Sequence, residues 1–294
     1  MKLVSYQSDD GQSHLGALHR DRIVNLHQAS RAELPDDMLQ FLQLGDSAME
    51  MARALVAENS AEYSADITLE SVKLLAPITN PAKVVAIGLN YMDHVAEAGF
   101  EVPEFATMFC KYSSAIIGSD DNIRWSQKLT QQVDYEAELA LVIGKTARNV
   151  AAADAYDYIA GYLNCNDVTA RDLQFRPGDQ WLRGKCLDSF CPLGPWLVSA
   201  DEIPDPHDLS IQCRVNGRVL QDSNTSQIIH RIPQLIEYLS EAFTLQPGDV
   251  IITGTPHGVG AFRKPPLWLT DGDVVEVEIE GLGVLTNHCV IEND

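Results

Sequence analysis

The sequence predicts a β-rich α+β protein in which a mixed β-roll or sandwich carries peripheral helices. Short segments with strand character recur along most of the chain after residue 80, and turn signals such as Asn216-Gly217 and Asp271-Gly272-Asp273 separate them. Few helical segments lie between these strands. Because strands and helices do not alternate regularly, a doubly wound parallel sheet is not expected.

Residues 1–75 are predicted to form a small α+β unit of their own. Apolar residues at helical spacing predict a helix from about Leu34 to Glu58. Two prolines within residues 75–81 indicate a linker, so a larger unit is expected at residues 76–294. The strands predicted for the small unit are Lys2–Tyr6, His14–Leu18 and Arg22–Asn25.

The larger unit is predicted to hold most of the strands. One helix is expected over Ser226–Ala242, where isoleucines and leucines follow the helical period. The predicted strands are Val84–Ile87, Glu136–Ile143, Tyr158–Asn164, Ser210–Val215, Val250–Thr253 and Val274–Ile279.

Composition and charge exclude several classes of partner. With 45% hydrophobic and 21% charged residues, the 294-residue chain resembles ordinary soluble globular proteins. Its net charge of −21 argues against nucleic acid or an anionic membrane as a partner, because both require basic patches. The N-terminus lacks a signal-peptide pattern and the chain lacks a long apolar run. We therefore expect a cytoplasmic protein whose six cysteines are free thiols.

The segment from Asp134 to Gly144 is the most informative part of the chain. Glu136 and Glu138 stand two residues apart at the start of an apolar, strand-like run. Side chains at this spacing leave the same face of a strand, about 7 Å apart along the backbone. Two like charges near apolar surroundings need a compensating positive charge, and a hard divalent cation bound through oxygen is the simplest one. Paired acids on a solvated strand face are the ordinary alternative.

A third carboxylate, Asp167, follows a strand-like run and precedes polar residues at helical spacing. It is predicted either to cap the next helix or to complete an all-oxygen site suited to Mg²⁺ or Mn²⁺ rather than zinc. Helical geometry would place Asp167, Arg171 and Gln174 on one face. Ordinary surface polarity is the alternative for Arg171 and Gln174.

Three further segments contain candidate chemical groups. His94 and Glu97 stand three residues apart in a predicted short helix, where the carboxylate would orient the imidazole as a base. Lys185 lies in a segment rich in Gly, Pro and aromatic residues, where it would either be a surface charge or neutralise a developing oxyanion. Thr255 belongs to a loop of small residues that would bind an anion or form only a tight turn.

Together, these motifs resemble the fumarylacetoacetate hydrolase family, and they occur in the family's order. The resemblance covers about residues 75–294 and comprises the Gly-Leu-Asn-Tyr…His…Glu segment, Glu-x-Glu, Asp followed by Arg and Gln, Gly-Lys…Phe-Cys-Pro-Leu-Gly-Pro, and Thr-Gly-Thr-Pro. Cys186 stands where serine is common in relatives. No obvious fourth acidic ligand precedes His94, which favours the bacterial acylpyruvase and 2-hydroxyhepta-2,4-diene-1,7-dioate isomerase branch.

The resemblance implies a mixed β-roll catalytic domain, usually dimeric, with a divalent cation. Glu136, Glu138 and Asp167 would bind Mg²⁺ or Mn²⁺. His94 and Glu97 would activate water. Lys185, Arg171, Gln174 and Thr255 would line the site of a small 2-oxo acid substrate, with Lys185 also acting in catalysis.

The expected reaction is hydrolysis of a carbon–carbon bond in an acylpyruvate-like 2,4-dioxo acid, which yields pyruvate or a related 2-oxo acid and a carboxylic acid. Decarboxylation of oxaloacetate and isomerisation of a dicarboxylate would use the same enolate chemistry and remain alternatives. A non-catalytic metal-binding protein is a more remote alternative, which the combination of His94, Glu97 and Lys185 disfavours.

Overall fold

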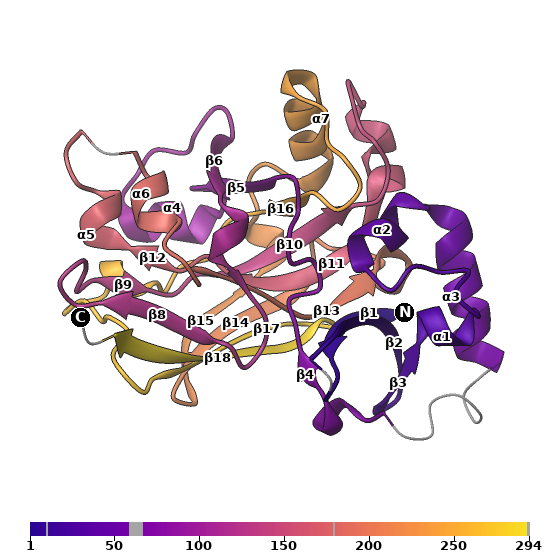
Figure 1. Cartoon of the computed structure of the whole chain (residues 1–294). Coiled ribbons are helices and arrows are strands. Elements are labelled where there is room, and N and C mark those ends of the chain that lie inside the picture. Colours follow the sequence, from indigo (N-terminus) through magenta and orange to yellow (C-terminus); the bar gives the residue numbers. More distant parts are fainter. Residues whose placement is uncertain (10, 59–66, 179, 293–294) are drawn as a thin grey trace.

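Two β-sheets of mixed strand direction form the centre of the structure, which is a computed structural model (Figure 1). It describes residues 1–9, 11–58, 67–178 and 180–292. Most neighbouring strands are antiparallel, whereas β16 and β5, β13 and β7, and β18 and β8 pair in parallel. The prediction of a β-rich α+β fold with a mixed β-roll is therefore confirmed.

The larger sheet has eleven strands. It contains strands on both sides of the predicted linker at residues 75–81. Its main path runs β3-β2-β1-β13-β11-β10-β16-β5-β6, with β4 paired to β1 and β7 paired to β13. The strands are β1 (Lys2–Gln7), β2 (Ser13–His19), β3 (Arg22–Asn25), β4 (Lys73–Leu74), β5 (Val84–Gly88), β6 (Thr107–Lys111), β7 (Ile116–Ile117), β10 (Ala137–Ile143), β11 (Ile159–Asn166), β13 (Cys191–Ser199) and β16 (Val250–Ile252).

The second sheet has five strands and covers one face of the larger sheet. Its order is β15 (Arg218–Asn224), β14 (Ser210–Val215), β17 (Val274–Ile279), β18 (Gly283–Glu292) and β8 (Asn122–Ser126). A short pair, β9 (Val133–Asp134) and β12 (Thr169–Ala170), lies apart from both sheets. Alternate residues of β10, such as Leu139 and Leu141, pack with Val275 and Val277 of β17 in one apolar core. Period-two burial on facing strands produces this core.

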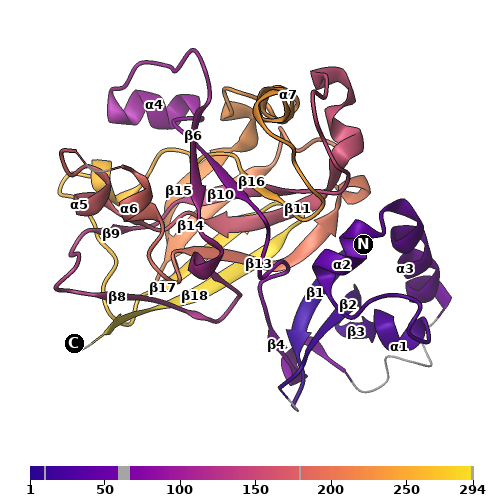
Figure 2. The ribbon, with the colours of Figure 1, turned by 45° about the horizontal axis from the view of Figure 1, so that its top comes forward.

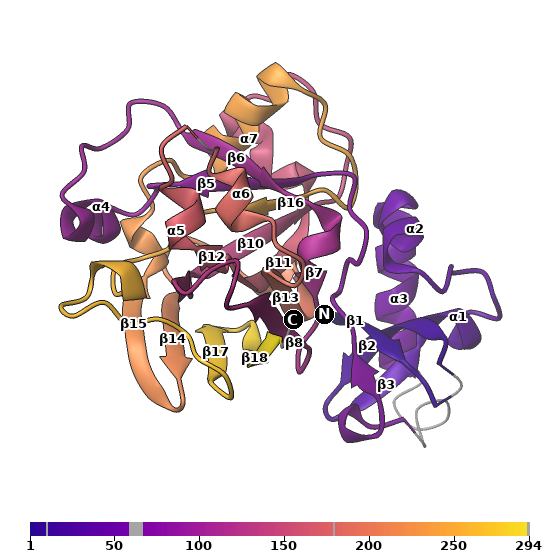
Figure 3. The ribbon, with the colours of Figure 1, turned by 60° about the vertical axis from the view of Figure 1, so that its left-hand side comes forward.

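The opposite face of the larger sheet carries a second apolar core. There Ala140 and Val142 of β10 pack in one cluster with Phe41 and Leu42 of the N-terminal helices. Figures 2 and 3 show the N-terminal elements grouped on one side of the molecule. The helices are α1 (Leu26–Ala29), α2 (Met38–Gln43), α3 (Asp46–Glu58), α4 (Met92–Ala98), α5 (Arg171–Gln174), α6 (Leu182–Lys185) and α7 (Ile232–Ala242).

The N-terminal strands are joined to the rest of the chain by backbone hydrogen bonds. β1 pairs antiparallel with β13, and Leu3 stands opposite Leu197. Strands from both sides of residue 75 therefore belong to one sheet. The predicted division into two domains at this residue stays a prediction.

Two of the predicted helices are shorter than the sequence suggests. The expected helix from Leu34 to Glu58 is divided into α2 and α3, because Gly45 between them adopts a left-handed conformation with φ of 70°. The expected helix from Ser226 begins at Ile232, with a proline in its first turn, and residues 225–227 form a separate 3₁₀ turn.

None of the helices in the described part of the chain combines the length and apolarity that a membrane crossing requires. All six cysteines have free thiols, as the sequence predicts.

Candidate active site

The register of β10 and β11 brings the predicted carboxylates together. Glu138 stands opposite Cys165 and Ala137 opposite Asn166, so the start of β10 meets the end of β11. Glu136 lies just before β10, and its carbonyl accepts a hydrogen bond of 2.9 Å from the Asp167 amide. As a result, one carboxylate oxygen from each of Glu136, Glu138 and Asp167 lies within 4.8 Å of the others, and all three residues are buried.

Two positively charged side chains that the sequence analysis names, Lys185 and Arg171, bind these carboxylates. The Lys185 Nζ donates to Glu136 Oε2 and to Asp167 Oδ2, each at 2.5 Å. The Arg171 Nη2 donates to Glu136 Oε1 at 2.6 Å. Although burial alone would raise the pKa of Glu136, Arg171 and Lys185 hold this pKa well below its usual range. Glu136 is thus an ionised carboxylate with charged partners on both oxygens.

Glu138 receives much less compensation. Its Oε2 accepts one backbone hydrogen bond, of 2.6 Å, from the Gly254 amide. Gly254 has φ of 104°, and a Cβ at this position would lie 2.9 Å from Asn90 Cβ, so the approach of this amide requires glycine. Burial, Asp167 and Glu136 raise the pKa of Glu138 well above its usual range.

A buried lysine that the sequence analysis does not single out also contacts the cluster. Lys111, on strand β6, donates to Asp167 Oδ1 at 2.5 Å and to the Val168 carbonyl at 3.3 Å. Burial alone would lower the pKa of Lys111, but Asp167 raises it above its usual value. Both oxygens of Asp167 therefore face an ammonium group.

Asp134 is a second residue that the sequence interpretation missed. Its buried carboxylate accepts hydrogen bonds from Arg171 Nε at 2.9 Å and from the amides of Gly260 and Ala261 at 2.7 and 3.0 Å. It thereby ties Arg171 to the turn at Gly260–Phe262. In the sequence, its position two residues before Glu136 is the one sign that the two side chains share a strand face.

The structure corrects the predicted helical stacking of Asp167, Arg171 and Gln174. Asp167 follows the end of β11, whereas α5 begins at Arg171 after the intervening strand β12. The side chain of Asp167 binds lysines and does not cap α5, whose N-cap residue is Ala170. Arg171 and Gln174 do share a face, because Arg171 Nη1 donates to Gln174 Oε1 at 2.9 Å.

α5 and α6 approach each other at a glycine. A Cβ on Gly184 would lie 2.5 Å from the Ala170 carbonyl oxygen and 2.6 Å from the Gln174 amide nitrogen, so this position accepts no side chain. Figure 3 shows the two helices side by side. Lys185 immediately follows this contact, which places its ammonium beside the carboxylates.

His94 and Glu97 lie on α4, as predicted, but their contact is loose. The distance from His94 Nδ1 to Glu97 Oε2 is 3.8 Å, and among the described residues this nitrogen has no hydrogen-bond partner. The carboxylate of Glu97 instead accepts from the Gly258 amide at 3.0 Å. Burial would raise the pKa of Glu97, but His94 and the Gly258 amide lower it below its usual value. The ring of His94 packs 5.7 Å from that of Phe262.

A cavity of about 270 Å³ joins these groups. Eight of the nine predicted site residues line it, and Glu97 is the exception. Thr255 is one of these lining residues, and its Oγ1 accepts a hydrogen bond from Gln221 Nε2 at 2.8 Å. Aromatic side chains, among them Phe109, Trp181 and Phe262, form much of the remaining wall. Such a mixture of aromatic walls and a few polar groups is typical of small-molecule sites.

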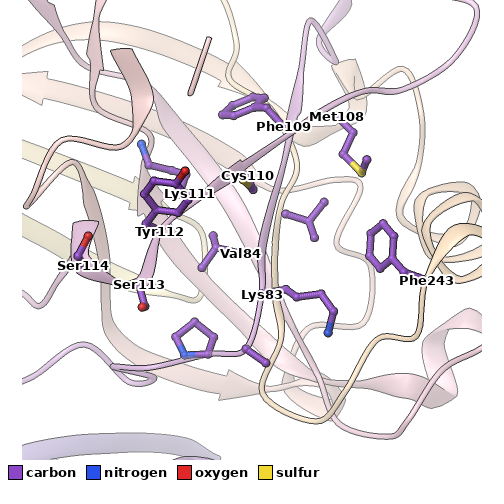
Figure 4. A pocket seen from close by; sticks show the side chains of 13 residues that line it. Lys83, Val84, Met108, Phe109, Cys110, Lys111, Tyr112, Ser113, Ser114 and Phe243 are labelled. Atoms are coloured by element: carbon purple, nitrogen blue, oxygen red, sulfur yellow. The ribbon is translucent and has the colours of Figure 1, made fainter. Parts of the chain in front are cut away.

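A larger cavity, of about 690 Å³, lies beside strand β6 (Figure 4). Figure 4 shows Phe109 and Lys111 on one side of this strand and Met108 on the other. The described residues that line it include no Asp, Glu or His. The chemical groups are therefore concentrated in the smaller cavity.

The donor set of the smaller cavity fits a hard divalent cation. Three carboxylates offer only oxygen ligands, which Mg²⁺ and Mn²⁺ prefer, and no His or Cys belongs to this cluster among the described residues. Glu138 has a raised pKa and only one backbone donor, so a cation would supply the charge that it lacks.

Comparison with known proteins identifies the family. The family model "Fumarylacetoacetate (FAA) hydrolase C-terminal" matches residues 83–290. The chain is 47% identical to the mitochondrial oxaloacetate tautomerase fahd2 of Xenopus laevis, over 99% of this chain and 90% of that relative.

Two solved structures share the whole fold. Fumarylacetoacetate hydrolase from Exiguobacterium antarcticum has a TM-score of 0.81 at 36% identity, covering 99% of this chain and 100% of the other. Maleylpyruvate hydrolase from Sphingobium sp. SYK-6, in complex with manganese and pyruvate, has a TM-score of 0.80 at 30% identity and full coverage of both chains. The family match, the sequence identity and the structural likeness lead to one conclusion: this chain belongs to the fumarylacetoacetate hydrolase family.

Proposed function

We propose that this protein interconverts the keto and enol forms of oxaloacetate with the help of a divalent cation. The observation that carries the proposal is the single small cavity in which His94, Lys185 and the carboxylate cluster face one another. These groups are an acid, a base and a cation site, which suffice for keto–enol exchange. The full-length identity of 47% to an oxaloacetate tautomerase supports this substrate.

Glu136, Glu138 and Asp167 would hold Mg²⁺ or Mn²⁺. When bound there, the cation supplies Lewis acidity that lowers the energy of negative charge on the substrate oxygens. The manganese and pyruvate in the related maleylpyruvate hydrolase structure support both the ion and the 2-oxo acid class.

The chain's own residues would move the protons. The imidazole of His94 takes a proton from C3 of oxaloacetate, and the electron pair of that C–H bond forms the C2–C3 double bond. The Lys185 Nζ donates a proton to the C2 oxygen, which has gained the negative charge. The reverse transfers regenerate the keto form, and Arg171 keeps Glu136 ionised throughout. No water is consumed, so this reaction does not require a tight His94–Glu97 pair.

Hydrolysis of an acylpyruvate is the second candidate. His94 and Glu97 lie close enough for Glu97 to orient the imidazole after a small movement, since they are 3.8 Å apart. A general base so oriented would activate water for attack on the distal carbonyl. The likeness to maleylpyruvate hydrolase supports this candidate. Decarboxylation of oxaloacetate would require the same enolate, and a non-catalytic role would leave His94 in the cavity unexplained.

Parallel assays with oxaloacetate and with acylpyruvates distinguish these functions and test the metal. Purified protein with Mn²⁺ is expected to accelerate enol-to-keto conversion of oxaloacetate, followed by the ultraviolet absorbance of the enol. Treatment with EDTA should abolish this activity, and Mg²⁺ or Mn²⁺ should restore it better than Zn²⁺, because all proposed ligands are carboxylates.

Two results of these assays would contradict the proposal. Much faster hydrolysis of acylpyruvates than tautomerisation of oxaloacetate would make the hydrolase the better assignment. Full activity in protein shown to be metal-free would remove the cation from the site.

The family resemblance also suggests a homodimer. We expect light scattering coupled to size-exclusion chromatography to give about twice the chain mass of 32.4 kDa. The mass of a single chain at working concentration would contradict this expectation. The predicted cytoplasmic location stays a prediction, and the Xenopus relative is named as a mitochondrial protein.

A further inference from the structure

One wall of the proposed site is made by two aromatic side chains. Phe109 of β6 and Trp181, just before α6, pack edge to face with ring centroids 6.0 Å apart. Lys185 Nζ lies 5.1 Å from the centroid of the Phe109 ring. This wall is therefore in contact with the group that we expect to donate a proton.

A glycine fixes the position of this wall. An added Cβ on Gly88, at the end of β5, would lie only 2.6 Å from Trp181 Cζ3. The indole therefore packs directly against the main chain of β5. Contact with a strand backbone on one side and with Phe109 on the other leaves the indole little freedom to move away.

The other side of the same wall faces a separate hollow. Phe109 and Trp181 line both the site cavity of about 270 Å³ and a surface hollow of about 510 Å³. The remaining residues that line this outer hollow are Thr107, Met108, Cys110, Gln180 and Leu182. The aromatic pair is thus the partition between a small chemical site and additional space next to it.

From this arrangement we infer that Trp181 determines substrate length. The aromatic pair would admit short 2-oxo acids and exclude those with an extended chain. This inference rests on the proposed function, which assigns the 2-oxo acid head group to the site. A smaller residue at position 181 would join the two spaces, and an apolar chain would then extend beside Met108 and Leu182.

The test measures binding, so that it does not depend on turnover. Isothermal titration calorimetry of the full-length, Mn²⁺-loaded protein would compare straight-chain 2-oxo acids from pyruvate to 2-oxooctanoate. Wild-type affinity should fall with chain length. In Trp181→Ala the affinity for 2-oxooctanoate relative to pyruvate should rise about ten-fold or more, because each methylene that finds an apolar pocket adds a factor of that order.

Matched variants make the result specific. Trp181→Phe should give an intermediate ratio, whereas Tyr156→Ala removes an exposed aromatic side chain outside both spaces and should leave the ratio unchanged. If Trp181→Ala does not fold, judged by circular dichroism, Trp181→Leu takes its place.

The possible outcomes separate this inference from the proposed function. An unchanged ratio in folded Trp181→Ala or Trp181→Leu, or wild-type protein that binds 2-oxooctanoate as tightly as pyruvate, would overturn the inference. A relaxed ratio in protein without oxaloacetate tautomerase activity would support the inference and contradict the proposed function. Absence of any 2-oxo acid binding to wild type would overturn both.

Discussion

Replacing Glu138 by alanine is expected to lower the activity on oxaloacetate by about 10³-fold, the loss that follows removal of one major stabiliser of developing negative charge. Glu138 is buried, and its one hydrogen-bond donor among the described residues is the Gly254 amide. Burial and the neighbouring carboxylates of Asp167 and Glu136 raise its pKa. A cation held by the three carboxylates depends on this group, so the variant should lose the cation together with the activity.

The measurement has a readout besides catalysis. For wild type, Mn²⁺ at a hundred-fold excess over its Kd should stabilise the folded protein by about 2.7 kcal/mol, visible as a rise in Tm. Glu138→Ala and the isosteric Glu138→Gln should show little or no rise, while Glu241→Gln, an exposed carboxylate on α7, should behave as wild type. A normal rise in Tm in both Glu138 variants would show that this residue is not a ligand.

Replacing His94 by alanine is expected to slow tautomerisation, and any acylpyruvate hydrolysis, by about 10²-fold or more, the usual contribution of a general base. The imidazole is buried in the site cavity, and its Nδ1 has no hydrogen-bond partner among the described residues. It is therefore available to move a proton. Decarboxylation of oxaloacetate, if present, should fall less, because it needs chiefly an electron sink and a cation beside the enolate.

Lys185→Ala provides the comparison for this second prediction. Lys185 donates to Glu136 and Asp167, so its loss should damage all three reactions. His94→Ala should retain the Mn²⁺-dependent rise in Tm, because His94 is not among the proposed ligands. Tautomerisation at the wild-type rate in His94→Ala would exclude His94 as the proton carrier.

Local sequence patterns predict β10 and β11 and the residues next to them in the chain, but they miss other strands, among them β6, β13 and β18. Glu136 and Glu138 share a face because of their spacing, and Asp167 was placed at the end of a strand by the apolar run before it. The helix boundaries were less accurate, because Gly45 and the proline in the first turn of α7 act locally within otherwise periodic segments. Periodicity indicates that a helix exists more reliably than where it begins or ends.

The missed residues depend on contacts between segments far apart in the chain. Lys111 reaches Asp167 only because β6 lies at the edge of a sheet whose central strands carry the carboxylates. Its neighbours in sequence, an exposed cysteine and an exposed tyrosine, resemble an ordinary surface. Asp134 likewise acquires its role from the amides of Gly260 and Ala261. Strand order and register determine these contacts, and local patterns in a single sequence do not reveal strand order or register.

The glycine contact between α5 and α6 has a consequence for how this site can change during evolution. At Gly184 the two helices touch through main-chain atoms, with no side chain between them. The relative placement of Arg171 and Lys185, which flank Glu136, is therefore set by the radii of backbone atoms. Apolar residues around the site can be exchanged when their neighbours repack. At Gly184, by contrast, any side chain would collide with main-chain atoms, so the distance between the two helices cannot be adjusted in small steps. Substitutions can thus change the walls of the cavity during evolution while the side chains of Arg171 and Lys185 keep their positions.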